Sequence, residues 1–146
     1  MEKQQVIVER TYDVSPGRLW EAITDPEQMK QWYLPVEEFR PEPGFETAFD
    51  HHARGKVFPH VWKVTEVIPN EKISYDWRYP GFPGNSRVTF ELISDENGTR
   101  IKVTHEGLET FEGDKNPDLS PENFTQGWNQ FIGNRLKSFL EMVPAH

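Results

Sequence analysis

The chain has no cysteine among its 146 residues. This absence excludes disulfides, thiol nucleophiles and cysteine metal ligands, and it is compatible with a reducing compartment. No apolar run approaches the roughly 20 residues that span a bilayer, and the first ten residues, MEKQQVIVER, lack the apolar stretch of a secretory signal. We therefore expect a cytoplasmic protein with no membrane insertion.

Positive charge is also in short supply, with 16 Lys and Arg against 24 Asp and Glu and a net charge of -8. A phosphate backbone is bound by cations, so this balance argues against nucleic acid as a partner. The sequence contains no Gly-x-Ser-x-Gly nucleophile elbow and no glycine loop of the P-loop or dinucleotide type. These absences disfavour acyl-transfer and nucleotide enzymes, and we expect no cofactor.

Aromatic residues are plentiful, with five Trp and ten Phe. The length fits one domain over residues 1–146, which would bury roughly 70% of the surface of its unfolded chain. Aromatic walls around an internal cavity would account for this composition, and so would plain aromatic packing.

Apolar periodicity and turn residues divide the chain into a few elements. Alternation over 5–14 predicts a strand, and a Ser or Asp cap directly before Pro predicts short helices over 16–24 and 26–32. Turn signals at hairpin spacing predict only strands over 33–107. The polar segment 109–122 is expected to be an exposed loop, with a lid over a cavity as the alternative.

Ser120-Pro121 predicts the start of a last helix, whose apolar residues recur at steps of three and four and must lie on the sheet. Gly127 and Gly133 each cost this helix about 1 kcal/mol against Ala, so we expect them to permit a close approach or a bend.

Hairpin registers predict which side chains face inward. A two-residue loop at Asn97-Gly98 places His105 opposite Phe90. A turn at Asn70-Glu71 places Glu66 opposite Tyr75, which would bring a carboxylate inside.

A turn near residues 53 and 54 places Phe58 opposite Phe49, and Trp62 opposite Phe45. The three hairpins thus predict one aromatic inner face that carries a few polar groups.

The same residues carry a family resemblance. They are Pro16, Leu19, Trp20, Ala22, Thr24, Asp25, Pro26 and Trp32, then the stretch EVIPNEKISYDW, the run THEGL with His105 and Gly107, and finally Gly127-Trp128, Phe131, Leu136 and Leu140. In order and spacing, over nearly the whole chain, this set resembles the START-like superfamily, which includes the birch pollen allergen. Within it, the set is similar to the branch named for homology to the activator of the heat-shock-protein-90 ATPase.

The resemblance implies an α+β helix-grip fold, in which a curved antiparallel sheet wraps around a long C-terminal helix and two short helices follow the first strand. A cavity lies between sheet and helix. Related proteins bind lipids, sterols, polyketides and other hydrophobic ligands there, and some catalyse cyclisation or hydrolysis. The N-terminal chaperone-binding domain of the eukaryotic activator has no counterpart in this sequence.

The inner face supplies the candidate ligand-binding residues, and Trp128 comes first because a helix residue beside Gly127 can lean over an opening. The predicted set is Trp128, His105, Trp77, Tyr75, Trp62, Phe90, His60 and Phe58. For each of these residues, structural packing alone is the alternative interpretation.

Catalytic chemistry, if there is any, would use His105 as base and Tyr75 or Glu66 as acid, since a histidine titrates near neutrality. The alternatives are a neutral, hydrogen-bonded His105 and a Glu66 that reaches water.

Four further residues suggest a metal site, namely Asp50, His51, His52 and His60. However, His51 and His52 adjoin in a strand and point to opposite faces, so we predict no metal site.

Three hypotheses for function follow. The first is binding of a small hydrophobic molecule of lipid, polyketide or aromatic type in the cavity. The second is a cavity enzyme of cyclase or hydrolase type. The third is a chaperone-associated interaction module acting through the outer face of the sheet, although charged outer residues such as Arg87, Glu91, Arg100 and Lys102 argue against an apolar patch there.

Overall fold

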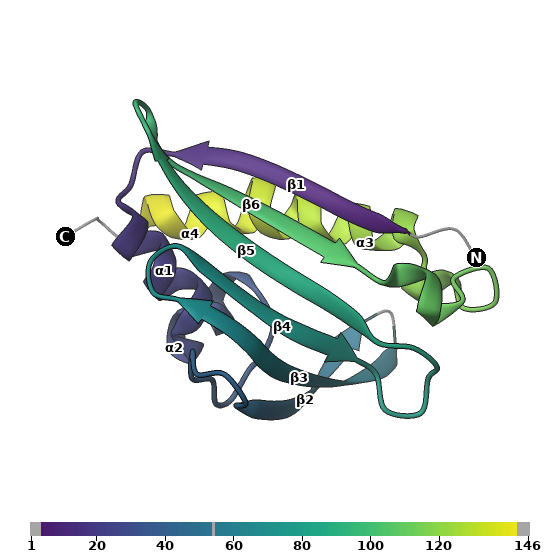
Figure 1. The fold of residues 1–146 in the computed structure, drawn as a ribbon. Helices are drawn as coiled ribbons and strands as arrows, with labels where there is room; N and C mark the ends of the chain where they lie inside the picture. Colours follow the sequence, from purple (N-terminus) through teal and green to yellow (C-terminus); the bar gives the residue numbers. More distant parts are fainter. Residues whose placement is uncertain (1–3, 54, 143–146) are drawn as a thin grey trace.

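Six antiparallel strands form a twisted sheet that covers a C-terminal helix in the computed structural model, which describes residues 4–53 and 55–142 (Figure 1). The strands are β1 (Gln5–Tyr12), β2 (Glu46–Ala53), β3 (Lys56–Ile68), β4 (Lys72–Arg78), β5 (Ser86–Asp95) and β6 (Gly98–Glu106). Their order in the sheet is β1-β6-β5-β4-β3-β2. This arrangement confirms the predicted α+β helix-grip fold.

Two short helices, α1 (Pro16–Thr24) and α2 (Pro26–Trp32), follow β1 with the predicted bounds. The Ser15 Oγ accepts a hydrogen bond from the Arg18 amide at 3.1 Å, and the Asp25 Oδ1 accepts one from the Glu27 amide at 3.2 Å. These caps satisfy amides that have no partner inside the helix.

The C-terminal helix begins at Pro121, after Ser120 caps the Asn123 amide at 3.2 Å. It consists of α3 (Pro121–Trp128), a π-helical segment η3 (Asn129–Arg135) and α4 (Leu136–Met142). The Tyr12 hydroxyl of β1 donates to the Ile132 carbonyl inside the π-helical segment. No helix in the described part of the chain is long and apolar enough to cross a membrane.

The predicted segment 109–122 forms two 3₁₀ turns, η1 (Leu108–Phe111) and η2 (Pro117–Leu119). Phe111 and Leu119 are buried in the core, so the expectation of a wholly exposed loop is wrong. Apolar side chains anchor this segment between β6 and α3.

Two hairpin registers differ from the prediction by two residues. Asp95 pairs with Gly98, so that His105 lies opposite Val88 and not Phe90. β6 begins at Gly98, where the Cβ of any other residue would lie 2.1 Å from the Tyr12 carbonyl oxygen, so this close approach to β1 requires glycine.

The β2–β3 hairpin shows the same shift, because Phe58 lies opposite His51 instead of Phe49. A shift of two preserves the face of each side chain, so the predicted inner face holds in both hairpins.

The pairing of β3 with β4 contains a β-bulge between Val64 and Glu66. The bulge turns Glu66 outward, where it is half-exposed and forms an ion pair with Lys72 at 3.2 Å. The predicted inward pairing of Glu66 with Tyr75 is therefore wrong. Tyr75 pairs with Val64 and shares a hydrogen bond between hydroxyl groups with Tyr33 at 2.7 Å.

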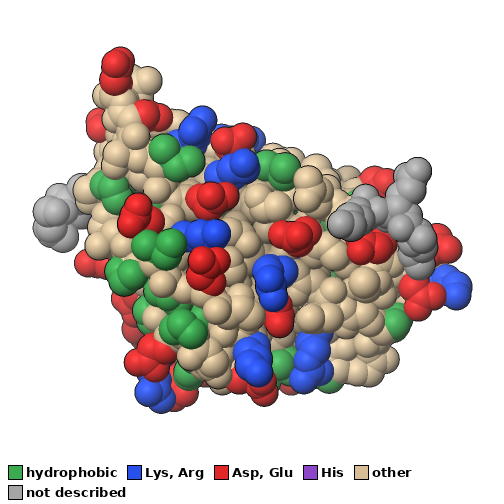
Figure 2. All heavy atoms as spheres, in the orientation of Figure 1, with side chains coloured by type: hydrophobic (Ala, Val, Ile, Leu, Met, Phe, Trp, Pro, Cys, Tyr) green, Lys and Arg blue, Asp and Glu red, His purple; other side chains and the backbone are tan. Residues whose placement is uncertain are grey.

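The outer face of the sheet carries mixed charges, and Figure 2 shows acidic and basic side chains interspersed over it. Cross-strand pairs account for this pattern, including Glu9 with Arg100 at 3.7 Å and Asp76 with Arg87 at 3.2 Å. Exposed Ile7, Ile68 and Ile93 stand among them. The charges break up the apolar surface on this face.

Candidate functional site

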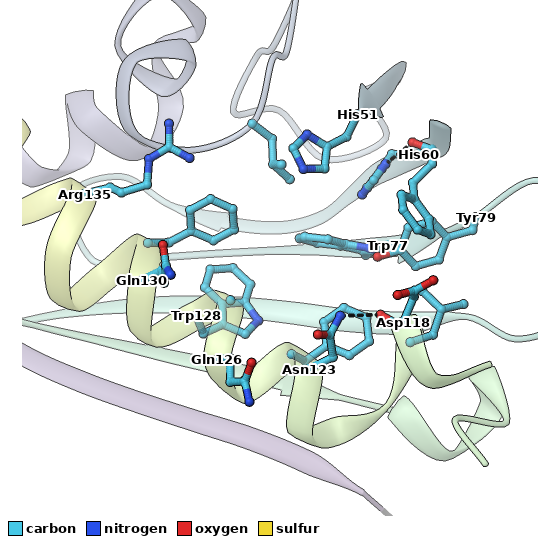
Figure 3. Close-up of a pocket in the computed structure, with 16 residues that line it drawn as sticks. His51, His60, Trp77, Tyr79, Asp118, Asn123, Gln126, Trp128, Gln130 and Arg135 are labelled. Carbon is cyan, nitrogen blue, oxygen red and sulfur yellow. Dashed lines mark hydrogen bonds between the residues drawn. The ribbon is translucent and has the colours of Figure 1, made fainter. Parts of the chain in front are cut away.

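A pocket of about 340 Å³ opens between the inner face of strands β2 to β4 and the C-terminal helix (Figure 3). Its aromatic wall consists of Phe58, Trp77, Tyr79, Phe124, Trp128 and Phe131. Its polar side chains are His51, His60, Asp118, Asn123, Gln126, Gln130 and Arg135. The sheet supplies one side of the pocket and the helix the other.

The turn η2 closes one end of the pocket through Asp118 and Leu119. Asn123 donates to the Asp118 carbonyl at 2.7 Å, and the Asp118 carboxylate forms an ion pair with Lys56 at 2.8 Å. These two contacts tie the helix start and the β2–β3 hairpin to the same turn, which fixes the width of the pocket at this end.

Four of the predicted ligand-binding residues line the pocket, namely Phe58, His60, Trp77 and Trp128. The other four, Trp62, Tyr75, Phe90 and His105, have 0% exposure and lie behind the pocket wall. The prediction missed Tyr79, Phe124 and Phe131. A signal for them existed, because Tyr79 extends the inward alternation of Tyr75 and Trp77, and the two phenylalanines share the helix stripe of Trp128.

His105 sits in a chain of hydrogen bonds. The indole Nε1 of Trp128 donates to Nδ1 of His105 at 3.0 Å. Because Nδ1 therefore accepts, the ring proton lies on Nε2, which donates to Ser86 Oγ at 2.8 Å. The Ser86 hydroxyl in turn donates to the Trp77 carbonyl at 2.7 Å.

Burial lowers the pKa of His105 to about 3, so its ring is neutral. Both ring nitrogens are committed to protein partners, and no lone pair remains for a general base. The geometry favours the alternative of a neutral, hydrogen-bonded histidine. Its effect on the pocket is indirect, because the Nδ1 bond fixes the orientation of the Trp128 indole in the wall.

Tyr75, one of the two candidate acids, is also buried and lies outside the pocket lining. Its hydroxyl bonds only to Tyr33 among the described residues, and burial raises the pKa values of both phenols. Tyr33 also stacks on Trp32 and on Trp62, with ring centroids 4.8 Å and 5.5 Å apart. The rings of this cluster are buried behind the residues that line the pocket.

His60 differs from His105 because its ring projects from β3 into the pocket (Figure 3). Nδ1 lies 2.8 Å from the Phe58 carbonyl oxygen, and the ring stacks on Phe49 with centroids 4.8 Å apart. Burial lowers the pKa of His60 to about 4.

No group of three His, Cys, Asp or Glu side chains within residues 4–53 and 55–142 could hold a metal ion.

Residues 13–141 match the family model described as "Activator of Hsp90 ATPase homolog 1-like protein". The chain belongs to this family. The match covers most of the sequence and confirms the expected branch of the START-like superfamily. No curated protein matches the chain.

Solved structures share the fold of this family member. Protein CV1439 from Chromobacterium violaceum is 24% identical with a TM-score of 0.79, over 94% of this chain and 97% of that one. Protein MLL2253 from Mesorhizobium loti is 28% identical with a TM-score of 0.74, over 97% and 99%. DynU16, a putative protein in the dynemicin biosynthetic locus, is 22% identical with a TM-score of 0.71, over 97% of this chain and 48% of DynU16.

Proposed function

We propose that this chain binds a small, largely hydrophobic molecule of aromatic, polyketide or lipid type in the pocket between the sheet and α3. The observation that carries the proposal is the open volume of about 340 Å³ bounded by six aromatic side chains. Ligand pockets typically occupy about 300–1,000 Å³ and combine an apolar wall with a few polar groups. This pocket lies at the small end of that range, which favours a ligand of one to three rings or a short acyl chain.

Apolar burial would supply most of the affinity. A ligand that buries about 200 Å² of apolar surface gains about 5 kcal/mol at 25 cal/mol per Å², before the cost of association is subtracted. Trp128 needs little ordering on binding, because His105 already holds its indole. The place of DynU16 in a biosynthetic locus agrees with a role of this fold near small-molecule synthesis.

Titration with the neutral fluorescent probe N-phenyl-1-naphthylamine tests the proposal. We expect saturable one-to-one binding, and at least fivefold weaker binding for Phe58→Ala and Trp128→Ala. Phe45→Ala is the matched control, because Phe45 packs against Phe39 away from the pocket. Equal affinity in the wild type and both pocket variants would show that the probe binds elsewhere.

The other hypotheses gain less support from the geometry. A cyclase or hydrolase with His105 as base lacks both an available ring nitrogen and contact between that ring and the pocket. A chaperone-associated module acting through the sheet would need an apolar outer patch, and ion pairs divide that surface.

A further inference from the structure

We infer that Nε2 of His60 accepts a hydrogen bond from the ligand, so that the pocket selects planar aromatic molecules that carry a hydroxyl group. The inference rests on the binding function proposed above and names the chemical class of its ligand. It follows from the tautomer of His60, from the open side of its ring and from the rings around it.

The tautomer is set by the strand itself. Nδ1 lies 2.8 Å from the Phe58 carbonyl oxygen, and a carbonyl oxygen can only accept a hydrogen bond. Nδ1 therefore carries the proton. The side chain is 3% exposed, and desolvation keeps such a ring neutral. A neutral imidazole protonated on Nδ1 has its lone pair on Nε2, which makes Nε2 an acceptor.

Nε2 forms no hydrogen bond with any described residue. In the described part of the chain, the buried side-chain atoms that lack a partner belong to Arg18, Trp62 and Trp77. The ring of His60 lines the pocket, and Nε2 is its polar atom without a protein partner among the described residues. A purely apolar ligand would bury this acceptor without giving it a hydrogen-bond donor, which costs binding free energy.

The surrounding rings favour a planar aromatic donor. The centroids of Tyr79 and Trp77 lie 4.6 Å and 5.3 Å from that of His60, at steep interplanar angles of 65° and 62°. Aromatic rings pack against such walls edge to face or offset. Gln126, Gln130 and Arg135 are exposed, whereas His60 is buried. His51, Asp118 and Asn123 are half-buried, and Asp118 already pairs with Lys56. His60 is thus the one buried polar side chain among the described residues of the pocket lining, and a ligand hydroxyl that is fully buried meets it first.

A matched pair of probes isolates this hydrogen bond. 2-Naphthol and 2-methoxynaphthalene share the ring system, and only the former can donate. We expect the wild type to bind 2-naphthol roughly tenfold more tightly in calorimetric titrations at pH 7.5. In His60→Phe, which keeps a ring against Phe49, the preference should vanish while 2-methoxynaphthalene binds within about threefold of its wild-type affinity. His52→Phe, exposed on β2 and outside the pocket lining, should keep the preference.

A measurement on the unaltered protein removes any dependence on folding of the variants. In long-range ¹H–¹⁵N spectra of the imidazole rings, Nε2 of His60 should resonate as an unprotonated nitrogen. It should shift upfield on addition of 2-naphthol and remain in place with 2-methoxynaphthalene.

The outcomes separate the two proposals. If 2-naphthol, 2-methoxynaphthalene and N-phenyl-1-naphthylamine all fail to bind the wild type, the proposed binding function is overturned together with this inference. If the probes bind but 2-naphthol leaves Nε2 unmoved, or its preference survives in His60→Phe, only the assignment to His60 is overturned.

Discussion

The two buried histidines of this chain have opposite hydrogen-bond states. His105 has both ring nitrogens bonded to protein groups, whereas His60 has only Nδ1 bonded. A buried polar group contributes to a unique fold when all its bonds are made, and it contributes to recognition when one bond is left for a ligand. This difference assigns His105 to the support of the pocket and His60 to its lining.

The bond from Trp128 to His105 can be tested by removing its donor. Trp128→Phe keeps an aromatic ring but leaves Nδ1 of His105 unpaired in the core, so the free energy of unfolding should fall by about 2–4 kcal/mol, including the lost ring volume. Trp20→Phe is the control, because Trp20 is only half-buried and its indole makes no hydrogen bond among residues 4–53 and 55–142. Urea unfolding measures both changes. Equal losses in the two variants would contradict a special role for the Trp128 indole.

The neutral state of both histidines predicts a pH dependence of stability. Burial lowers the pKa of His105 to about 3 and that of His60 to about 4, against 6.5 in the unfolded chain. Below pH 6.5 the unfolded chain takes up protons that the native rings refuse, so the free energy of unfolding should fall on acidification. The slope is at most about 1.4 kcal/mol per pH unit for each ring.

Urea titrations at pH 7.0, 6.0 and 5.0 measure this slope. His105→Gln should make it shallower, whereas His52→Gln, exposed on β2, should leave it unchanged. A wild-type stability that is constant from pH 7 to 5 would contradict the buried neutral state of these rings.

At the scale of elements, the two glycines of the C-terminal helix are not equivalent. A Cβ at Gly127 would meet nothing within 4 Å, whereas one at Gly133 would lie 3.3 Å from Nη2 of Arg10. Gly127→Ala should therefore raise the free energy of unfolding by about 0.5–1 kcal/mol, because alanine loses less backbone entropy in a helix. Gly133→Ala should gain less or lose stability. Thermal unfolding followed by circular dichroism compares them, and a larger gain at Gly133 would refute this distinction.

Helix starts were predictable from the sequence because their signals are local. A capping side chain and the proline after it act within a few residues, so α1, α2 and the start at Pro121 appear as expected. Hairpin registers depend on distant neighbours. In the β5–β6 hairpin Asp95 pairs with Gly98, and Gly98 also approaches Tyr12 of β1, a contact between distant parts of the chain that no local pattern predicts.

The candidate site was predicted only in part for the same reason. Alternation along the strands predicts which side chains face inward, but the position of the helix decides which of them meet open space. Trp62 and Phe90 face inward and are sealed beneath Tyr33, whereas Phe58 and Trp77 lie where α3 leaves a gap. No glycine or other turn residue marks the bulge between Val64 and Glu66, so the sequence alone predicts the wrong face of the sheet for Glu66.

At the scale of the whole molecule, the two faces of the sheet have different roles: the outer face is charged, and the inner face forms the aromatic core. The outer face carries ion pairs that contribute little to stability singly, about 0–1 kcal/mol each, and that keep apolar surface dispersed. The inner face concentrates the aromatic side chains, and the C-terminal helix and α1 both pack against it. The core and the proposed ligand pocket therefore share the same aromatic layer.

This shared layer predicts that occupancy of the pocket stabilises the entire fold. A ligand that binds only the native state adds RT ln(1 + [L]/Kd), which is about 2.7 kcal/mol at a free concentration of 100 Kd. For a chain of this length, that gain corresponds to a rise in Tm of about 5–10 °C. Differential scanning calorimetry with N-phenyl-1-naphthylamine measures the rise, and Phe58→Ala should reduce it in proportion to its weaker binding. A Tm that does not change at a saturating probe concentration would mean that the probe binds the native and the unfolded chain equally well. That result would contradict binding in a folded pocket between sheet and helix.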